Sequence, residues 1–272
     1  MVKMGNVWDR TSEVLSGRAG MLAAIAVPAL LVPTIVRDGF VGYATPGTPV
    51  FALIGGLLSI IVLVIMLWGE LAIIAASTLP TTGRAEAQAL ASRRLLPLIG
   101  VSLVMVLIAG LLLTPAFIAL AGSGFDWQRA AAGIAQTSVN AGRLAFAGLY
   151  LLVFAIIALF VGARLVVVNA VVLNESLGLG AIRRSWVLTR GHTWRIVGVL
   201  LLFVLVVSIA VLAAGSVSGL VFRLILGADA VAMVSLLAGI VGSAVSTIFT
   251  VIALVFIAQL YVAFAARQPL PA

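Results

Sequence analysis

Long apolar runs constrain this chain more than any other feature of its sequence. From Ile196 to Phe222, for example, no side chain carries a charge. A helix needs about 20 mainly apolar residues to cross the hydrocarbon core of a bilayer. Strands of a membrane barrel would instead appear as roughly ten-residue segments of alternating hydrophobicity. The runs here are longer and continuous, so we expect helices that span a membrane.

The composition agrees with this class of protein. Of the 272 residues, 64% are hydrophobic and 9% are charged, whereas a soluble domain is about 45–50% apolar and about 25% charged. Too few polar side chains are present to cover the surface of a soluble globule. We therefore predict an all-α, polytopic membrane protein that forms a single membrane domain over residues 1–272.

Six apolar runs are separated by polar or proline-rich segments, which predicts six transmembrane helices. The first is the shortest, near the lower limit for crossing a bilayer, and it contains Pro28 and Pro33, which usually kink a span. The predicted spans cover about residues 20–36, 50–79, 95–121, 144–173, 196–222 and 230–265.

Basic residues are distributed unevenly between the two sides of this arrangement. The N-terminus, two of the links and the C-terminal tail carry most of the 16 Lys and Arg residues. The three opposite loops carry only Arg37, Arg129, Arg143 and Arg223. Because Lys and Arg accumulate in cytoplasmic loops, we expect both termini in the cytoplasm. The net charge of +8 is explained in the same way, without a nucleic-acid partner.

A basic segment before the fifth span predicts a short amphipathic helix over residues 176–190. Leu179, Ile182 and Trp186 recur at helical spacing on one face. Ser176 or Asn174 is suited to cap its first turn. The other faces carry Arg183, Arg184 and Arg190. A helix with Trp on one side and Arg on the other suits the membrane–water interface; the alternative is a solvated basic loop.

Such basic helices are expected to contact anionic lipid headgroups at the cytoplasmic leaflet. Glu175 is the only acidic residue close to the arginines of this segment, so we predict that all three face headgroups. The full set of candidate headgroup or interface residues is Arg183, Arg184, Arg190, Arg195, Trp186, Trp194, Arg93 and Arg94.

A related basic segment precedes each odd-numbered span, which indicates a threefold internal repeat. Residues 14–18 read VLSGR, residues 89–93 read ALASR and residues 187–191 read VLTRG. Each unit then contains a basic amphipathic helix, a span, an outer loop and a second span. The units cover about residues 5–79, 84–173 and 174–266. The identity is thin, so chance similarity of simple sequences is the alternative.

Three polar residues interrupt the even-numbered spans: Glu70, Arg164 and Gln259. An ionisable residue inside a span is a candidate functional site. Three interpretations remain open, namely a structural ion pair, side chains that reach the interface, and a transport or headgroup site. We predict that Glu70 and Arg164 meet at similar depth, with Gln259 as a hydrogen-bonding neighbour.

Residues for common catalytic and metal sites are scarce. The chain has no Cys, one His and eight scattered acidic residues. A metal-dependent phosphodiesterase needs several carboxylates and usually His. We therefore predict no catalytic residue, no metal site and no cofactor. His192 is interpreted as an interfacial polar residue.

Residues 163–202, ARLVVVNAVVLNESLGLGAIRRSWVLTRGHTWRIVGVLLL, resemble the glycerophosphoryl diester phosphodiesterase membrane-domain family and the related YciC-like bacterial inner-membrane proteins. The resemblance rests on Arg164-Leu165, Arg183-Arg184-Ser185-Trp186 and Trp194-Arg195. Some members continue into a soluble phosphodiesterase domain, whereas only a short tail follows Ala265 here, so the resemblance does not imply an esterase.

These observations together predict a non-enzymatic protein of the bacterial inner membrane with a lipid-interacting or scaffold role in envelope maintenance. The alternative is a transporter of small solutes or lipids with Glu70 and Arg164 along its path. A water-filled centre would favour the transporter and a packed centre the scaffold. The sequence leaves open whether the chain pairs with itself or with another protein.

Overall fold

The computed structural model is helical wherever the chain is described. It describes residues 4–43, 48–78, 81–126, 129–130, 133–136, 138–227 and 229–268, with the side chains of residues 41–43 excepted. Within these ranges every regular element is a helix. The predicted all-α class is therefore confirmed.

Six helical stretches are long and apolar enough to cross a membrane, as predicted for a multi-pass membrane protein. Four are continuous helices: α3 (Pro49–Thr78), α4 (Arg84–Ala121), α9 (Thr193–Leu226) and α10 (Val231–Ala265). Two are interrupted. The first joins α1 (Met4–Ala26), the π-helical turn η1 (Val27–Leu31) and α2 (Val32–Tyr43), and the fourth joins α6 (Ala141–Leu165) and α7 (Val168–Glu175). A short helix, α8 (Gly180–Leu188), precedes α9.

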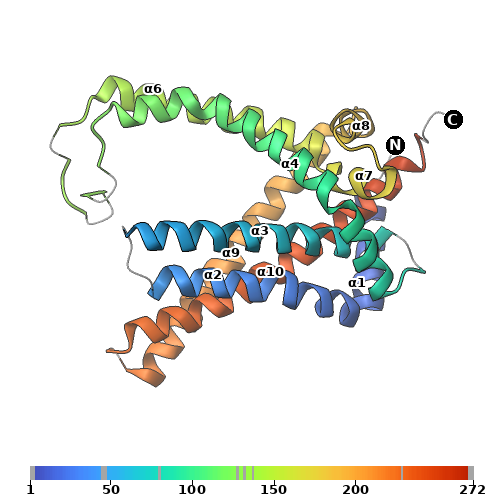
Figure 1. Ribbon diagram of the computed structural model, residues 1–272, viewed down its shortest axis with the longest axis horizontal. Coiled ribbons are helices and arrows are strands. Elements are labelled where there is room, and N and C mark those ends of the chain that lie inside the picture. Colours follow the sequence, from blue (N-terminus) through green and yellow to red (C-terminus); the bar gives the residue numbers. More distant parts are fainter. Residues whose placement is uncertain are drawn as a thin grey trace.

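The long helices run back and forth between two ends of the molecule, with α9 and α10 oblique to α3 (Figure 1). We call the end where α1 begins and α10 ends the terminal end, and α7 and α8 lie there too. The opposite end, where α2 is joined to α3, α4 to α6 and α9 to α10, is the hairpin end. Both ends of the chain therefore belong to the same side of the molecule, as an even number of crossings requires.

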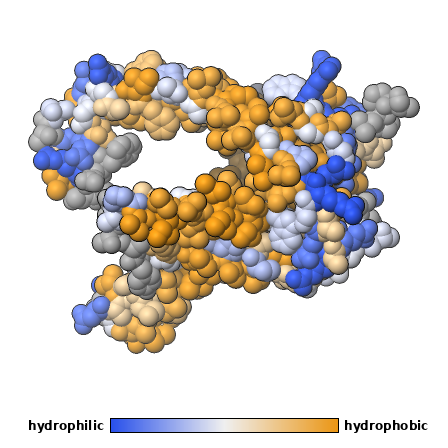
Figure 2. All heavy atoms as spheres, viewed as in Figure 1, coloured by the Kyte–Doolittle hydropathy of each residue, from blue (hydrophilic) through white to orange (hydrophobic). Residues whose placement is uncertain are grey.

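The buried core is concentrated towards the terminal end. Residues 71–76 of α3 and 170–173 of α7 are at most 1% exposed, and they pack in one cluster with the start of α1 and the end of α10. Towards the hairpin end the helices diverge, and Figure 2 shows an opening framed by apolar residues between the α4–α6 hairpin and α3. Leu111 of α4 is 75% exposed. Such walls suit contact with lipid chains rather than water.

The helical stretch that contains the first span starts at Met4, but its backbone is kinked at Arg18 (φ −128°, ψ 15°), close to the predicted start of the span at residue 20. The candidate spanning stretch is Met4–Phe40, which includes the basic segment before residue 20. As expected, Pro28 disturbs the helix, and the disturbance is the π-helical turn at Val27–Leu31. Next to it Gly69 approaches Ala29 so closely that a Cβ on Gly69 would lie 2.5 Å from the Cβ of Ala29.

The helix before the fifth span is shorter than predicted, and the expected caps are wrong. It covers Gly180–Leu188, and no side chain caps its start. Ser176 has a positive φ of 60° and ends α7 instead. Asn174 donates from Nδ2 to the carbonyl oxygen of Ala170 at 2.8 Å. Both polar residues thus complete the end of the preceding helix, which periodicity alone does not reveal.

Candidate lipid-binding groove

A groove of about 610 Å³ lies between α6, α8 and α9 near the terminal end. One wall is apolar and comes from α6, with Ile156, Ile157 and Phe160 among its residues. The other end of the groove is polar and aromatic. It is lined by Arg164, Trp186, His192, Thr193, Trp194 and Arg195. Four candidate residues from the sequence therefore line one groove beside an apolar strip of α6: Arg164, Trp186, Trp194 and Arg195.

Arg164 lies at the junction of α6 with α8. Its guanidinium carbon is 5.2 Å from the ring centroid of Trp186, and Nη1 donates to the carbonyl oxygen of Trp186 at 3.4 Å. A cation over an indole face gains about 0.5–1 kcal/mol at an exposed site. Arg164 also stands in the last turn of α6, where the helix dipole favours positive charge. The cation is thereby held at the polar end of the groove.

Arg164 is held in place by hydrogen bonds to its backbone at the break between α6 and α7. The carbonyl oxygen of Arg164 accepts hydrogen bonds from Ser185 Oγ at 2.8 Å and from Thr189 Oγ1 at 3.1 Å. Ser185 lies in α8 and Thr189 directly follows it, and both residues are fully buried. A helix end leaves carbonyl groups without intrahelical partners, and these two hydroxyls satisfy one of them. The same contacts dock α8 against α6 and so form the groove.

Aromatic and polar side chains from the start of α9 complete the groove. The ring of Trp194 packs edge-on against that of Phe160, with the two ring centroids 4.8 Å apart. Trp194 is 76% exposed. Arg195 follows it in the chain. Within the described part of the chain, His192 Nε2 and Thr193 Oγ1 are buried atoms without a hydrogen-bond partner. A buried polar atom usually has a partner, so these two atoms mark the polar end as a place suited to a polar ligand group.

The arginines of α8 and of the turn that follows it do not all point outward, which corrects one prediction. Arg183 and Arg190 are exposed, as expected for residues that face headgroups. Arg184 instead bonds from Nε to Glu175 Oε2 at 2.9 Å, and its side chain is only 12% exposed. The one nearby acid is sufficient to hold Arg184, because the αL residue Ser176 turns the chain so that Glu175 faces α8.

The second pair of predicted interface arginines lies on α4. Arg93 is exposed, whereas Arg94 is half-buried and its Nε has no hydrogen-bond partner among the described residues. Next to them, Trp68 of α3 donates from Nε1 to Ser92 Oγ at 3.0 Å. These two arginines lie on α4, outside the set of residues that lines the groove.

Glu70 and Arg164 do not form the predicted ion pair. Glu70 Oε2 accepts a hydrogen bond from Asn169 Nδ2 at 3.3 Å, and no ion pair among the described residues includes Glu70 or Arg164. The break after α6 separates the two positions, since it directs Arg164 to Trp186 and brings Asn169 of α7 to Glu70. Gln259 is also not their neighbour but donates to the carbonyl oxygen of Ser77 at 2.6 Å.

Two important polar residues escaped the sequence-based selection. Asn169 stands in an apolar run, where an amide is unusual enough to signal a buried polar contact. Arg18 donates from Nη1 to the carbonyl oxygens of Ala76 at 2.6 Å and Thr82 at 3.3 Å. It appeared only as part of the repeat. No spacing rule connects Arg18 with a helix end almost sixty residues away.

A central groove of about 500 Å³ runs between α2, α3, α9 and α10. Hydroxyl residues line it, but Thr34, Thr247 and Thr250 donate to carbonyl groups of their own helices. Neither Glu70 nor Arg164 lines this groove. Among the residues that the structure describes, no three His, Cys, Asp or Glu side chains are grouped so as to hold a metal ion.

Comparison with known proteins gives no match: no family model, no curated protein and no solved structure is similar to this chain.

Proposed function

We propose that this chain is a non-enzymatic membrane protein whose α6–α8–α9 groove binds an anionic phospholipid. The observation that carries the proposal is the arrangement of the groove. Arg164 and Arg195 stand at one end beside two tryptophans, and an apolar strip of α6 continues from them. A phosphodiester group would lie between the arginines, which bind phosphate oxygens through paired N–H groups. An acyl chain would follow Ile156 and Ile157.

The wider setting follows from charge and packing. We infer that the terminal end faces the cytoplasm of a bacterial cell, because most basic residues belong to it. The segments around α1, the start of α4 and α8 would then form three basic interfacial helices related by a threefold repeat. The resemblance of residues 163–202 to the phosphodiesterase membrane-domain and YciC-like proteins supports the same assignment. A lipid-interacting or scaffold role in envelope maintenance fits these properties.

The packing also weighs against the alternative, a transporter with Glu70 and Arg164 on one path. The helix ends at the terminal end form a tight core, and the two residues have different partners on different helices. The hydroxyl-lined central groove is the feature that would serve a transporter. Its threonine hydroxyls already donate to nearby backbone carbonyl groups, which leaves the hydroxyls of Ser243 and Ser246 among its polar lining.

The test is retention of lipid by purified protein. Wild-type protein is placed in nanodiscs of mixed phosphatidylglycerol and phosphatidylcholine and then released from them in a native mass spectrometer. The mass of the released protein should show selective retention of phosphatidylglycerol. The double variant Arg164→Gln, Arg195→Gln should lose this selectivity, by roughly tenfold or more for two charged hydrogen bonds. Arg84→Gln is the matched control, since Arg84 is exposed at the same end but lies outside the groove. Equal selectivity in wild type and double variant would refute the proposal.

A further inference from the structure

Helix α8 forms one side of the α6–α8–α9 groove, but it is too short to hold that position without support. It covers only Gly180–Leu188, and isolated helices shorter than about 12–15 residues are marginal in water. The backbone beside it is left-handed at three places, with a φ of 60° at Ser176, 51° at Gly178 and 81° at Gly191. Turns of this kind at the ends of an element can absorb its rotation. The position of α8 therefore depends on its tertiary contacts.

One set of these contacts faces the groove and docks α8 on α6. Trp186 lines the groove and lies against the guanidinium of Arg164. Ser185 and Thr189 both donate to the carbonyl oxygen of Arg164, at 2.8 and 3.1 Å. If α8 moved away, Arg164 would lose the indole beside its cation and two donors to its backbone. The polar end of the groove is therefore complete only while α8 is docked.

A second set of contacts holds α8 from another direction. Arg184 precedes Ser185, and neighbouring residues of a helix point about 100° apart. Arg184 Nε lies 2.9 Å from Glu175 Oε2, and the two side chains are only 12% and 5% exposed. The Tyr261 hydroxyl donates to Glu175 Oε1 at 3.1 Å, and Arg184 Nη2 donates to the carbonyl oxygen of Gln268. We call these four residues the α8 lock: Glu175, Arg184, Tyr261 and Gln268. None of them lines the groove.

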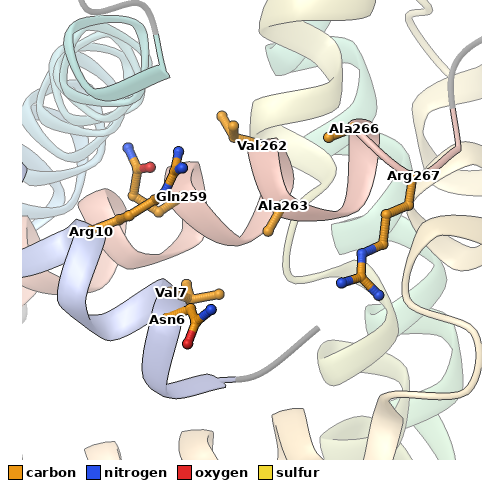
Figure 3. A pocket seen from close by; sticks show the side chains of 8 residues that line it. All are labelled: Asn6, Val7, Arg10, Gln259, Val262, Ala263, Ala266 and Arg267. Atoms are coloured by element: carbon orange, nitrogen blue, oxygen red, sulfur yellow. The ribbon is translucent and has the colours of Figure 1, made fainter. Parts of the chain in front are cut away.

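The α10 side of the lock belongs to a firmly packed part of the molecule. Figure 3 shows the start of α1 beside the end of α10, around a small pocket. Val7 of α1 is 2% exposed and belongs to the main core together with Leu260 and Phe264 of α10. The rings of Trp8 and Phe256 lie 6.3 Å apart. Because the end of α10 is fixed in this way, the lock opposes movement of α8.

We propose that Glu175 and Arg184 are positioning residues for the lipid site: their ion pair keeps α8 docked on α6, and an anionic lipid binds this docked arrangement. The inference rests on the proposed function of the groove. Buried pairs are screened by salt much less than exposed ones, and removing one partner leaves the other charge buried and unpaired. Lipid and lock then stabilise each other, because the coupling between two sites is reciprocal.

The first measurement is the selective retention of phosphatidylglycerol from mixed nanodiscs, at a temperature where every variant is folded. Affinity falls in proportion to the fraction of protein in which α8 is docked. Arg184→Gln and Glu175→Gln should therefore lower the selectivity by roughly tenfold or more. Arg184→Lys keeps the charge and Tyr261→Phe keeps the ion pair, so both should lose less. Arg183→Gln, exposed on the same helix, is the matched control and should behave like wild type.

The second measurement follows the position of α8 itself. The chain has no Cys, so spin labels can be attached to cysteines that replace Val187 of α8 and Leu152 of α6, both exposed. Wild type should give one narrow distribution of distances between the labels. Glu175→Gln and Arg184→Gln should give a broader one, and phosphatidylglycerol should narrow it again. A lock that contributes only to stability would leave the distribution of the folded protein unchanged.

The outcomes separate this inference from the proposed function. Wild type without selectivity for phosphatidylglycerol refutes the proposed function, and the positioning role falls with it. A selective wild type, together with unchanged selectivity in Glu175→Gln and Arg184→Gln, overturns the positioning role alone. Reduced selectivity without any change in the label distances overturns it as well. If neither of these two variants is recovered folded, the same comparisons are made with Arg184→Lys and Tyr261→Phe.

Discussion

Glu175 and Arg184 form an ion pair that is almost closed to solvent, with 2.9 Å between Oε2 and Nε. The carboxylate side chain is 5% exposed and the guanidinium side chain 12%. The other carboxylate oxygen accepts a hydrogen bond from the hydroxyl of Tyr261 at 3.1 Å, and Arg184 Nη2 donates to the carbonyl oxygen of Gln268 at 2.5 Å. The pair thus joins α7, α8 and the end of α10.

Removing one member of this pair should destabilise the protein strongly. Arg184→Gln leaves Glu175 charged and buried, and the loss of one partner of a buried pair costs about 3–5 kcal/mol. Glu175→Gln should have a similar effect, and the double variant should be damaged less than the sum of the two. The apparent melting temperature in detergent is the measurement. Arg183→Gln, one residue away and exposed, is the control and should change little.

The end of α3 provides a second prediction, because two distant residues satisfy its last carbonyl groups. Arg18 binds the carbonyl oxygen of Ala76, and Gln259 binds that of Ser77. Gln259→Leu should cost about 1–3 kcal/mol, the penalty for a buried acceptor that loses its partner. Hydrogen exchange should rise in the last turn of α3 before the rest of the helix. Ser59→Ala removes an exposed hydroxyl bond of the same helix and should leave exchange there unchanged.

The close contact between η1 and α3 provides the third prediction. A Cβ at Gly69 would lie 2.5 Å from the Cβ of Ala29, closer than the two atoms can approach. Gly69→Ala should therefore separate the helices and cost about 1–3 kcal/mol, as overpacking does. Gly56→Ala is a matched control in the same helix, with no atom within 4 Å of its Cβ. It should be neutral or slightly stabilising. Equal effects of the two changes would contradict the packing.

The sequence predicted the helical class and the number of spans because both depend on local composition. Every apolar run after the first is longer than the hydrocarbon core of a bilayer requires, and the first reaches the lower limit, so no distant contact is needed to predict the spans. The limits of the first span were less predictable. A polar segment such as residues 5–19 is compatible with a separate helix and with an extension of the span, and the stretch Met4–Phe40 has a kink at Arg18 between these two parts.

The partners of polar residues were not predictable in the same way. Glu70 and Arg164 were paired by their charges and by an assumed common depth, but Asn169 and Trp186 are their partners. The break between α6 and α7 decides this outcome, and it depends on hydroxyls more than twenty residues later. The groove residues Arg164, Trp186 and Trp194 were all selected from the sequence. Their shared cavity required the docking of α8.

The different partners of Glu70 and Arg164 give a fourth prediction. Effects of changes at residues without a shared partner usually add to within about 0.3–0.5 kcal/mol. Glu70→Gln and Arg164→Gln should therefore have additive effects on the apparent melting temperature. Glu70→Gln combined with Asn169→Leu should not be additive, since these two side chains are hydrogen-bonded. If the effects of Glu70→Gln and Arg164→Gln are coupled while those of Glu70→Gln and Asn169→Leu are additive, Glu70 and Arg164 form an ion pair after all.

The last prediction concerns the orientation of the chain in the membrane. The natural sequence has no Cys, so single cysteines can be introduced without background. The choice of positions matters, because Ser185 is 0% and Ser123 is 1% exposed, and a cysteine at either would be silent on both sides of the membrane. Thr81 and Gln268 at the terminal end are exposed, as are Thr48 and Ser138 at the hairpin end. If the terminal end is cytoplasmic, as the basic residues indicate, an impermeant thiol reagent added to intact spheroplasts should label Cys variants at Thr48 and Ser138. Variants at Thr81 and Gln268 should react only after the membrane is permeabilised. Labelling of only the Thr81 and Gln268 variants would show the opposite orientation. Labelling of one variant from the terminal end and one from the hairpin end would contradict the six membrane crossings.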